Sequence, residues 1–137
     1  MNARGWSPHL RVDWKGSFNY YFSITNMREA DGNAFLYATE HECWTGGFSG
    51  TGDATFRVER FSSGFFDVWL RTVFTGTVLD KSGTMVIQLV GKKESEVWKG
   101  EWVIVSGTGG LVDLVGQGTW GGTGICTRAK WRVPRMF

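Results

Sequence analysis

Glycine and tryptophan recur together along this chain, and their pairing constrains the fold more than any other feature of the sequence. The 137 residues include 20 Gly and 8 Trp but only 2 Pro. The two residue types meet in short stretches such as 98–102 and 118–122. Glycine supplies the turns, bulges and bends of a sheet, and the large indole fills the space that a small sheet protein must close. The pairing therefore predicts a closed antiparallel barrel with an aromatic-lined interior.

The length of the chain predicts one domain over residues 1–137, large enough to bury a core without disulfides or metals. Residues 1–15 are expected to form a partly ordered N-terminal arm. No stretch approaches the roughly 18 consecutive apolar residues of a membrane span, and residues 1–6 lack the apolar centre of a secretory signal. We therefore expect a cytoplasmic protein that does not enter a membrane.

Charge and cysteine content exclude several classes of partner. The net charge of +2 is too small to indicate nucleic acid, and the alternation of Arg128, Lys130 and Arg132 fits the solvent face of a strand. Cys43 and Cys126 lie far apart, and with two His in the chain they form no zinc pattern of familiar spacing. Free, buried thiols are the expected state of both cysteines.

Alternation of apolar and polar residues with a period of two dominates from residue 17 onward, and no helical stretch is convincing. A polar loop with a turn at 31–33 is expected over residues 26–33. An up-and-down meander of about eight strands has an interior that either fills with side chains or holds one small ligand. An open sandwich is the competing architecture. The predicted strands are 10–14, 17–25, 35–44, 48–61, 65–78, 84–90, 97–105, 111–120 and 123–133.

Four glycine-turn motifs carry a family resemblance: FTGTV at 74–78, KSGTMVIQ at 81–88, WVIVSGTGGL at 102–111 and GQGTW at 116–120. On these motifs the chain resembles a bacterial family of unknown function with the allene oxide cyclase-like barrel. The resemblance implies a closed, calycin-like barrel of about eight strands that often forms homo-oligomers. Relatives with this barrel include plant allene oxide cyclases and small bacterial enzymes that form rings in polyketide products. Their active sites lie within the barrel and need no metal or organic cofactor.

Strand alternation predicts which side chains point into the barrel. Lys99 and Glu101 are expected outside, which sends Trp98, Trp102 and Ile104 inward. The basic side chains of 123–133 are likewise expected outside, which leaves Trp131 inside. A bulge of one residue would reverse any of these assignments.

His41 is the first candidate catalytic residue. Facing the interior beside Tyr37 and Cys43, it would act as a general acid or base near neutral pH. The competing interpretations are a histidine satisfied by a neighbour at the barrel rim and a cysteine that is merely small and buried. In the opposite register Glu40 and Glu42 would face inward, and such a pair can do acid–base work because close like charges raise one pKa. Otherwise both glutamates lie on a solvated outer face.

Arg71 is the second candidate, and its role depends on Trp69. The apolar content of 65–74 favours an outer position for both residues, together with Asp67. If Trp69 instead faces the cavity, Arg71 accompanies it and can bind a carboxylate or enolate oxygen. Gln88 is either exposed or a single polar anchor inside the barrel.

These features favour a cofactor-independent cyclase or isomerase, such as a Diels–Alderase-like pericyclase of natural-product biosynthesis. A shaped apolar cavity and one or two polar groups suffice for such chemistry on a hydrophobic, unsaturated small molecule. The alternatives are a non-enzymatic binding barrel for a hydrophobic ligand and an oligomer whose interior is packed shut. The expected catalytic residues are His41, Arg71 and Tyr37, and the expected substrate-binding residues are Tyr20, Cys43, Trp69, Gln88, Trp98, Trp102 and Trp131.

Overall fold

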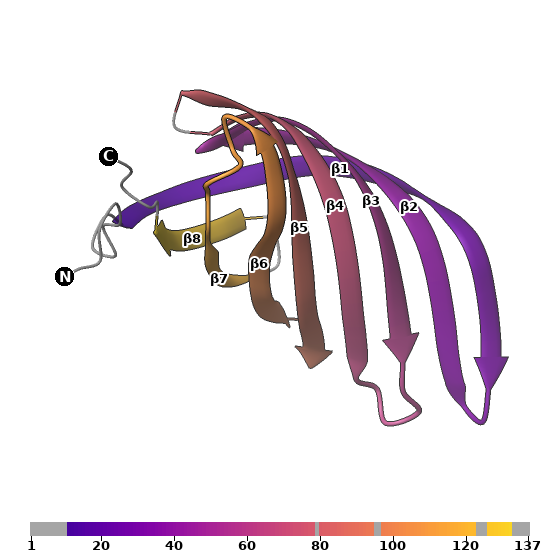
Figure 1. Ribbon diagram of the computed structural model, residues 1–137. Helices are drawn as coiled ribbons and strands as arrows, with labels where there is room; N and C mark the ends of the chain where they lie inside the picture. The colour runs from indigo at the N-terminus through magenta and orange to yellow at the C-terminus, as the bar shows by residue number, and fades with distance from the viewer. Residues whose placement is uncertain (1–10, 79, 95–96, 123–125, 133–137) are drawn as a thin grey trace.

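Eight antiparallel strands follow one another along the chain (Figure 1). The computed structural model describes residues 11–78, 80–94, 97–122 and 126–132, with side chains for 18–78, 80–93 and 97–121. None of the described residues is helical. The strands are β1 (Arg11–Ala30), β2 (Asn33–Gly46), β3 (Phe48–Arg60), β4 (Phe66–Val78), β5 (Lys81–Glu94), β6 (Val97–Gly109), β7 (Gln117–Gly122) and β8 (Cys126–Arg132). The all-β, antiparallel, hairpin-connected architecture predicted from the alternation is confirmed.

Each strand pairs with the next, and β8 pairs back with the first part of β1. The β1–β8 ladder runs from Arg11 opposite Arg132 to Ser17 opposite Cys126. After Ser17, β1 continues to Ala30 with β2 as its ladder partner. The sheet therefore meets itself at one end, and the β1–β2 and β3–β4 hairpins project beyond that end (Figure 1).

Several predicted boundaries are wrong. Residues 11–14 and 17–25 belong to one strand, β1, and β5 and β6 extend beyond the predicted strands 84–90 and 97–105. Residues 26–33 are not a loop, because β1 and β2 continue to a two-residue turn at Asp31 and Gly32, whose φ angles of 53° and 81° suit a tight left-handed turn. A bulge after Ile24 keeps both strands paired on either side of it. The predicted strand 111–120 begins only at Gln117. Before it the chain folds into turns, which place Leu111 and Leu114 in the core.

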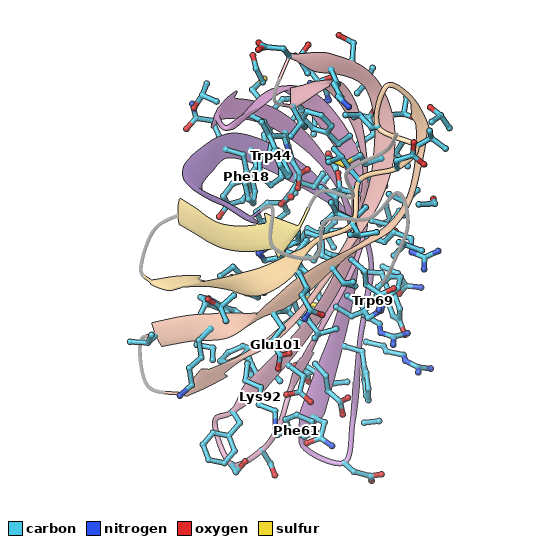
Figure 2. All side chains as sticks on the ribbon, turned by 60° about the vertical axis from the view of Figure 1, so that its left-hand side comes forward. Phe18, Trp44, Phe61, Trp69, Lys92 and Glu101 are labelled. Carbon is cyan, nitrogen blue, oxygen red and sulfur yellow. The ribbon has the colours of Figure 1, made fainter. Side chains whose placement is uncertain are left out.

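The core is aromatic and fills the end at which the sheet meets itself. Trp44, Phe48 and Phe74 are buried there, with 5.4 Å between the ring centroids of the two phenylalanines and 6.2 Å between those of Trp44 and Phe74. Phe18 of β1 lies 4.5 Å from the Trp44 ring, and Figure 2 shows these two side chains together. Burial of such large side chains is the main stabilising contribution in a sheet protein of this size.

Trp120 shows how glycine and tryptophan work together in this fold. Its indole lies against Gly91 of β5 and Gly100 of β6, which are paired across the ladder. Its Nε1 donates to the carbonyl oxygens of Val90 and Glu101, at 3.0 and 3.2 Å. A Cβ on Gly91 would collide with the indole, and a Cβ on Gly100 would collide with the Val90 carbonyl oxygen. The two glycines therefore provide the space that the indole occupies.

Candidate functional site

Two glutamates lie inside the sheet, on β2. Glu42 is completely buried and Glu40 is 8% exposed. Alternation along the strand places both on the inner face, with Trp44 as the next inward residue. Their neighbours across the β2–β3 ladder are small, since Glu40 lies opposite Ala54 and Glu42 lies opposite Gly52. The small neighbours leave room for two carboxyl groups in an otherwise apolar interior.

Glu42 is held by two side-chain donors. Its Oε1 accepts hydrogen bonds from Thr72 Oγ1 at 2.7 Å and from Trp44 Nε1 at 3.1 Å. Thr72 belongs to β4 and reaches Glu42 across β3 at the position of Gly52. A Cβ on Gly52 would collide with Glu42 Oε1 and would come within 2.7 Å of Thr72 Oγ1. The hydrogen bond between Thr72 of β4 and Glu42 of β2 therefore requires glycine at position 52.

Glu40 is a carboxylic acid rather than a carboxylate at neutral pH. Burial raises its pKa from 4.5 to about 9, and Glu42 adds to this effect as a hydrogen-bond partner and as a like charge. The protonated carboxyl group can donate its proton.

Among the described residues, three buried polar atoms have no hydrogen-bond partner outside the Glu40–Glu42 pair: Oε2 of Glu40, Oε2 of Glu42 and Nε1 of Trp102. Buried polar atoms normally find a partner in the protein or in ordered water. Trp102 is on β6, on the far side of the strand order from β2. The interior therefore contains an N–H donor on Trp102 and acceptor oxygens on the two glutamates that no described group outside the Glu40–Glu42 pair satisfies.

Exposed apolar side chains of β1, here called the apolar mouth, lie beside Glu40. The inward side chains of β1 beyond its ladder with β8 remain exposed, at 44% for Tyr20, 48% for Phe22 and 49% for Ile24. Tyr20 and Phe22 stack with 6.2 Å between ring centroids, and Phe22 lies directly opposite Glu40. The β1–β8 ladder ends at Ser17, and the apolar side chains of β1 beyond it are therefore exposed to solvent beside the acid.

The predicted inward positions of Tyr37, His41 and Cys43 are wrong. They lie on the outer face, because β2 buries the glutamates and Trp44 and alternation then turns the odd-numbered residues outward. His41 Nδ1 is 3.0 Å from Asp53 Oδ1 on the outer surface. Cys43 is a free thiol, but it is exposed rather than buried. The opposite register, with Glu40 and Glu42 inside, is the observed one.

Trp69, Arg71 and Gln88 also lie outside. The Arg71 Nη2 donates to Gln88 Oε1 at 3.1 Å, and the Arg71 guanidinium lies 6.0 Å from the centroid of the Trp69 ring. The apolar content of β4 had favoured an outer position for Trp69 and Arg71. This prediction is confirmed, because Leu70, Thr72 and Phe74 occupy the inner face. An inward pair of Trp69 and Arg71 is therefore wrong.

Three other aromatic residues that were predicted to bind the substrate, Tyr20, Trp98 and Trp102, lie on the inner face of the sheet. Trp102 and Ile104 are buried, Trp98 is half-buried with 6.0 Å between its ring and that of Phe66, and Tyr20 is at the mouth. The side chains of Trp131 and Cys126 lie outside the described ones.

Thr72 was not predicted from the sequence as a partner of Glu42. The sequence feature that could have indicated the inward orientation of Glu40 and Glu42 is Trp44, a large aromatic residue on the same face of β2.

Within the described parts of the chain, no group of three or more His, Cys, Asp or Glu side chains is placed to hold a metal ion.

Comparison with known proteins agrees with this fold. A family model described as a protein of unknown function, DUF3224, matches residues 15–124. The chain belongs to the DUF3224 family. One solved DUF3224 structure, a protein of unknown function from Shewanella oneidensis MR-1, has a TM-score of 0.76 with this chain at 14% identity. The similarity covers 88% of this chain and 95% of the Shewanella protein, and at this identity it shows a shared fold.

No curated protein matches this DUF3224 chain significantly. Among its described residues, no helix has the length and apolar character needed to cross a membrane.

Thr72→Val is expected to lower the free energy of unfolding by about 1.5–3 kcal/mol, because it removes a buried hydrogen bond to a carboxyl group while keeping the shape of the side chain. Thr75→Val is the matched control, since Thr75 lies on the outer face of the same strand and is exposed. That control is expected to change stability by less than about 0.5 kcal/mol. Urea denaturation measures both effects, and equal effects of the two substitutions would contradict the structural role of Thr72.

Proposed function

We propose that this DUF3224 protein is a cofactor-independent isomerase or cyclase that acts on a hydrophobic, unsaturated small molecule. The proposal includes a closed, allene oxide cyclase-like barrel as the working form, a cytoplasmic location and a role in natural-product biosynthesis. The observation that carries it is a buried Glu40 beside Glu42, next to exposed aromatic side chains of β1, in surroundings that raise the pKa of Glu40. A proton donor in an apolar cavity is what such a reaction requires.

In this mechanism the Glu40 carboxyl group gives its proton to one carbon of a conjugated system. A carboxylate of the Glu40–Glu42 pair then takes a proton from another carbon, so the double bonds move or a ring closes without oxidation or reduction. The apolar walls near the mouth, with Phe22, Ile24 and Phe56, hold the substrate in a reactive conformation. General acid–base catalysis of this kind contributes about 10²–10⁴-fold to the rate.

A non-enzymatic binding barrel is the second candidate. The two unpartnered carboxyl oxygens and the Trp102 Nε1 favour it, because they could bind the polar group of a ligand whose apolar part occupies the mouth. In this case Glu40 would fix the orientation of the ligand rather than transfer a proton. The two functions can be distinguished because only the enzyme converts its ligand into a product and exchanges protons with it.

Glu40→Gln is expected to reduce turnover of an active polyene by about 100-fold or more, because glutamine is similar in shape but cannot act as an acid. A panel of linear polyenes is incubated with the protein and separated by chromatography and mass spectrometry. An isomerisation or cyclisation gives a product of unchanged mass and altered retention. In D₂O the wild-type protein is expected to add one deuterium to the product, because the Glu40 proton exchanges with solvent.

Asp113→Asn is the matched control, since Asp113 is an exposed carboxylate in the turn before β7. It is expected to retain full turnover. Binding of polyenes without turnover by the wild-type protein would favour the binding barrel. A Glu40→Gln variant with undiminished turnover would refute the assigned role of Glu40.

A further inference from the structure

A second site of quite different character lies on the outer face of the sheet. A groove of about 1030 Å³ crosses the part of the sheet near the hairpins that project beyond the meeting of β1 and β8. Outward-facing residues of β2 to β7 form most of its lining. Figure 2 shows three of them, Trp69, Lys92 and Glu101, away from the Phe18 and Trp44 side chains. A volume of this size is typical of a small-molecule site.

The groove contains a row of four charged residues on four neighbouring strands. Glu59 of β3 lies opposite Asp67 of β4, Asp67 lies opposite Lys92 of β5, and Lys92 lies opposite Lys99 of β6. The row is therefore acidic at one end and basic at the other. Like charges directly opposite each other destabilise a sheet, and this row contains two such pairs side by side.

These four charges have no ion-pair partner among the described side chains. None of them forms an ion pair within 4.0 Å with another described residue, although Asp67 and Lys92 are direct neighbours across the ladder. The acidic members are partly shielded from solvent, whereas both lysines are exposed. The row thus presents two unpaired negative charges beside two unpaired positive charges, which is the complement of a dipolar ligand. The next outward row of the groove, which runs through Trp69 and Val90, carries Arg57 at one end and Glu101 at the other.

An apolar surface flanks the centre of this row. Trp69 and Val90 are paired across β4 and β5, two residues along from Asp67 and Lys92 on the same face. Val90 is 43% exposed. The guanidinium groups of Arg57 and Arg71 lie 5.0 and 6.0 Å from the centroid of the Trp69 ring and hold it in position.

We propose that this groove binds a short linear peptide with free termini. Its ammonium group binds Glu59 and Asp67, its carboxylate binds Lys92 and Lys99, and a central apolar side chain packs on Trp69 and Val90. Neighbouring strands lie about 4.8 Å apart, so the middles of the acidic and basic pairs are separated by about 10 Å. An extended chain spans at most about 3.3–3.6 Å per residue, so a peptide of about three residues fits this separation.

Isothermal titration with the tripeptide glycyl-leucyl-glycine tests the proposal directly on the wild-type protein. Acetylation of the amino terminus and amidation of the carboxyl terminus are each expected to weaken binding at least about tenfold, because each removes one charge-assisted contact. Binding of the unmodified tripeptide is expected to weaken as salt is added, because these charges are exposed. Free leucine is expected to bind at least about tenfold more weakly than the tripeptide, because it cannot span the row.

The double variant Lys92→Gln, Lys99→Gln assigns the ends of the peptide. It is expected to bind the free acid and the amide equally, while still discriminating against the acetylated form. Lys81→Gln, at an exposed lysine outside the groove, is expected to bind like the wild-type protein. Equal binding of blocked and unblocked tripeptides by the wild-type protein, equal binding of leucine, or no binding at millimolar peptide would each overturn the proposal.

Discussion

Replacing Glu40 by glutamine is expected to make the protein more stable than the wild type at pH 8, and to change its stability little at pH 4. The pKa of Glu40 is raised from 4.5 to about 9 in the folded protein, first by burial and then by Glu42. Between these values the unfolded chain releases a proton that the folded protein retains, so the wild-type protein loses stability as the pH rises. Glutamine resembles the protonated acid at every pH and removes this loss.

The size of the effect follows from the shift, at about 1.4 kcal/mol per pKa unit, and reaches several kcal/mol by pH 9. Urea denaturation at intervals from pH 4 to pH 9 measures it for both proteins. Glu29→Gln serves as the control, because Glu29 is exposed and its ion pair with Arg60 spans 3.8 Å. A wild-type stability that stays constant from pH 5 to pH 9, matched by the Glu40→Gln variant, would show that Glu40 titrates as an ordinary carboxyl group.

Phe74→Ala is expected to cost about 3–5 kcal/mol of unfolding free energy, which is a large part of the total stability of a small domain. Phe74 is completely buried, and its ring contacts those of Trp44 and Phe48. The sheet cannot close over the cavity because the ladders on both sides of β4 hold the backbone in place. Thermal and urea unfolding measure the loss.

Phe65→Ala is the matched control for Phe74→Ala, since Phe65 is 49% exposed beside the β3–β4 turn. It is expected to cost less than about 1 kcal/mol. Similar losses from the two substitutions would mean that the aromatic cluster around Phe74 is not the core that stabilises the fold.

Strand content was predictable from the sequence because alternation and hairpin turns are local signals. The predicted strands 65–78 and 84–90 leave a connection between them, and in the structure β4 ends at Val78 and β5 begins at Lys81. The extension of β1 and β2 as far as Asp31 was not predictable from residue types, because polar residues after Ile24 are typical of a loop. Pairing with β2 keeps them in a strand, and a bulge lets the ladder continue.

The orientation of β2 was predicted wrongly for a physical reason. Two glutamates on one face normally indicate the solvent side, and this expectation placed His41 in the interior. In the folded protein Glu42 is buried because Thr72 and Trp44 donate to it. Thr72 lies 30 residues away in the sequence, and no local pattern shows that Gly52 opens the path between them. The candidate site therefore depends on a register that only the three-dimensional structure supplies.

The position of Trp120 links the two faces of the sheet. Gly91 and Gly100 line the outer groove, and the indole lies against them from the inside. Neither glycine contributes a side chain, and Trp120 is itself among the residues that line the groove, so an occupant of the groove lies close to the indole. The fluorescence of Trp120 is therefore expected to respond both to occupation of the outer groove and to changes in the core against which the indole packs.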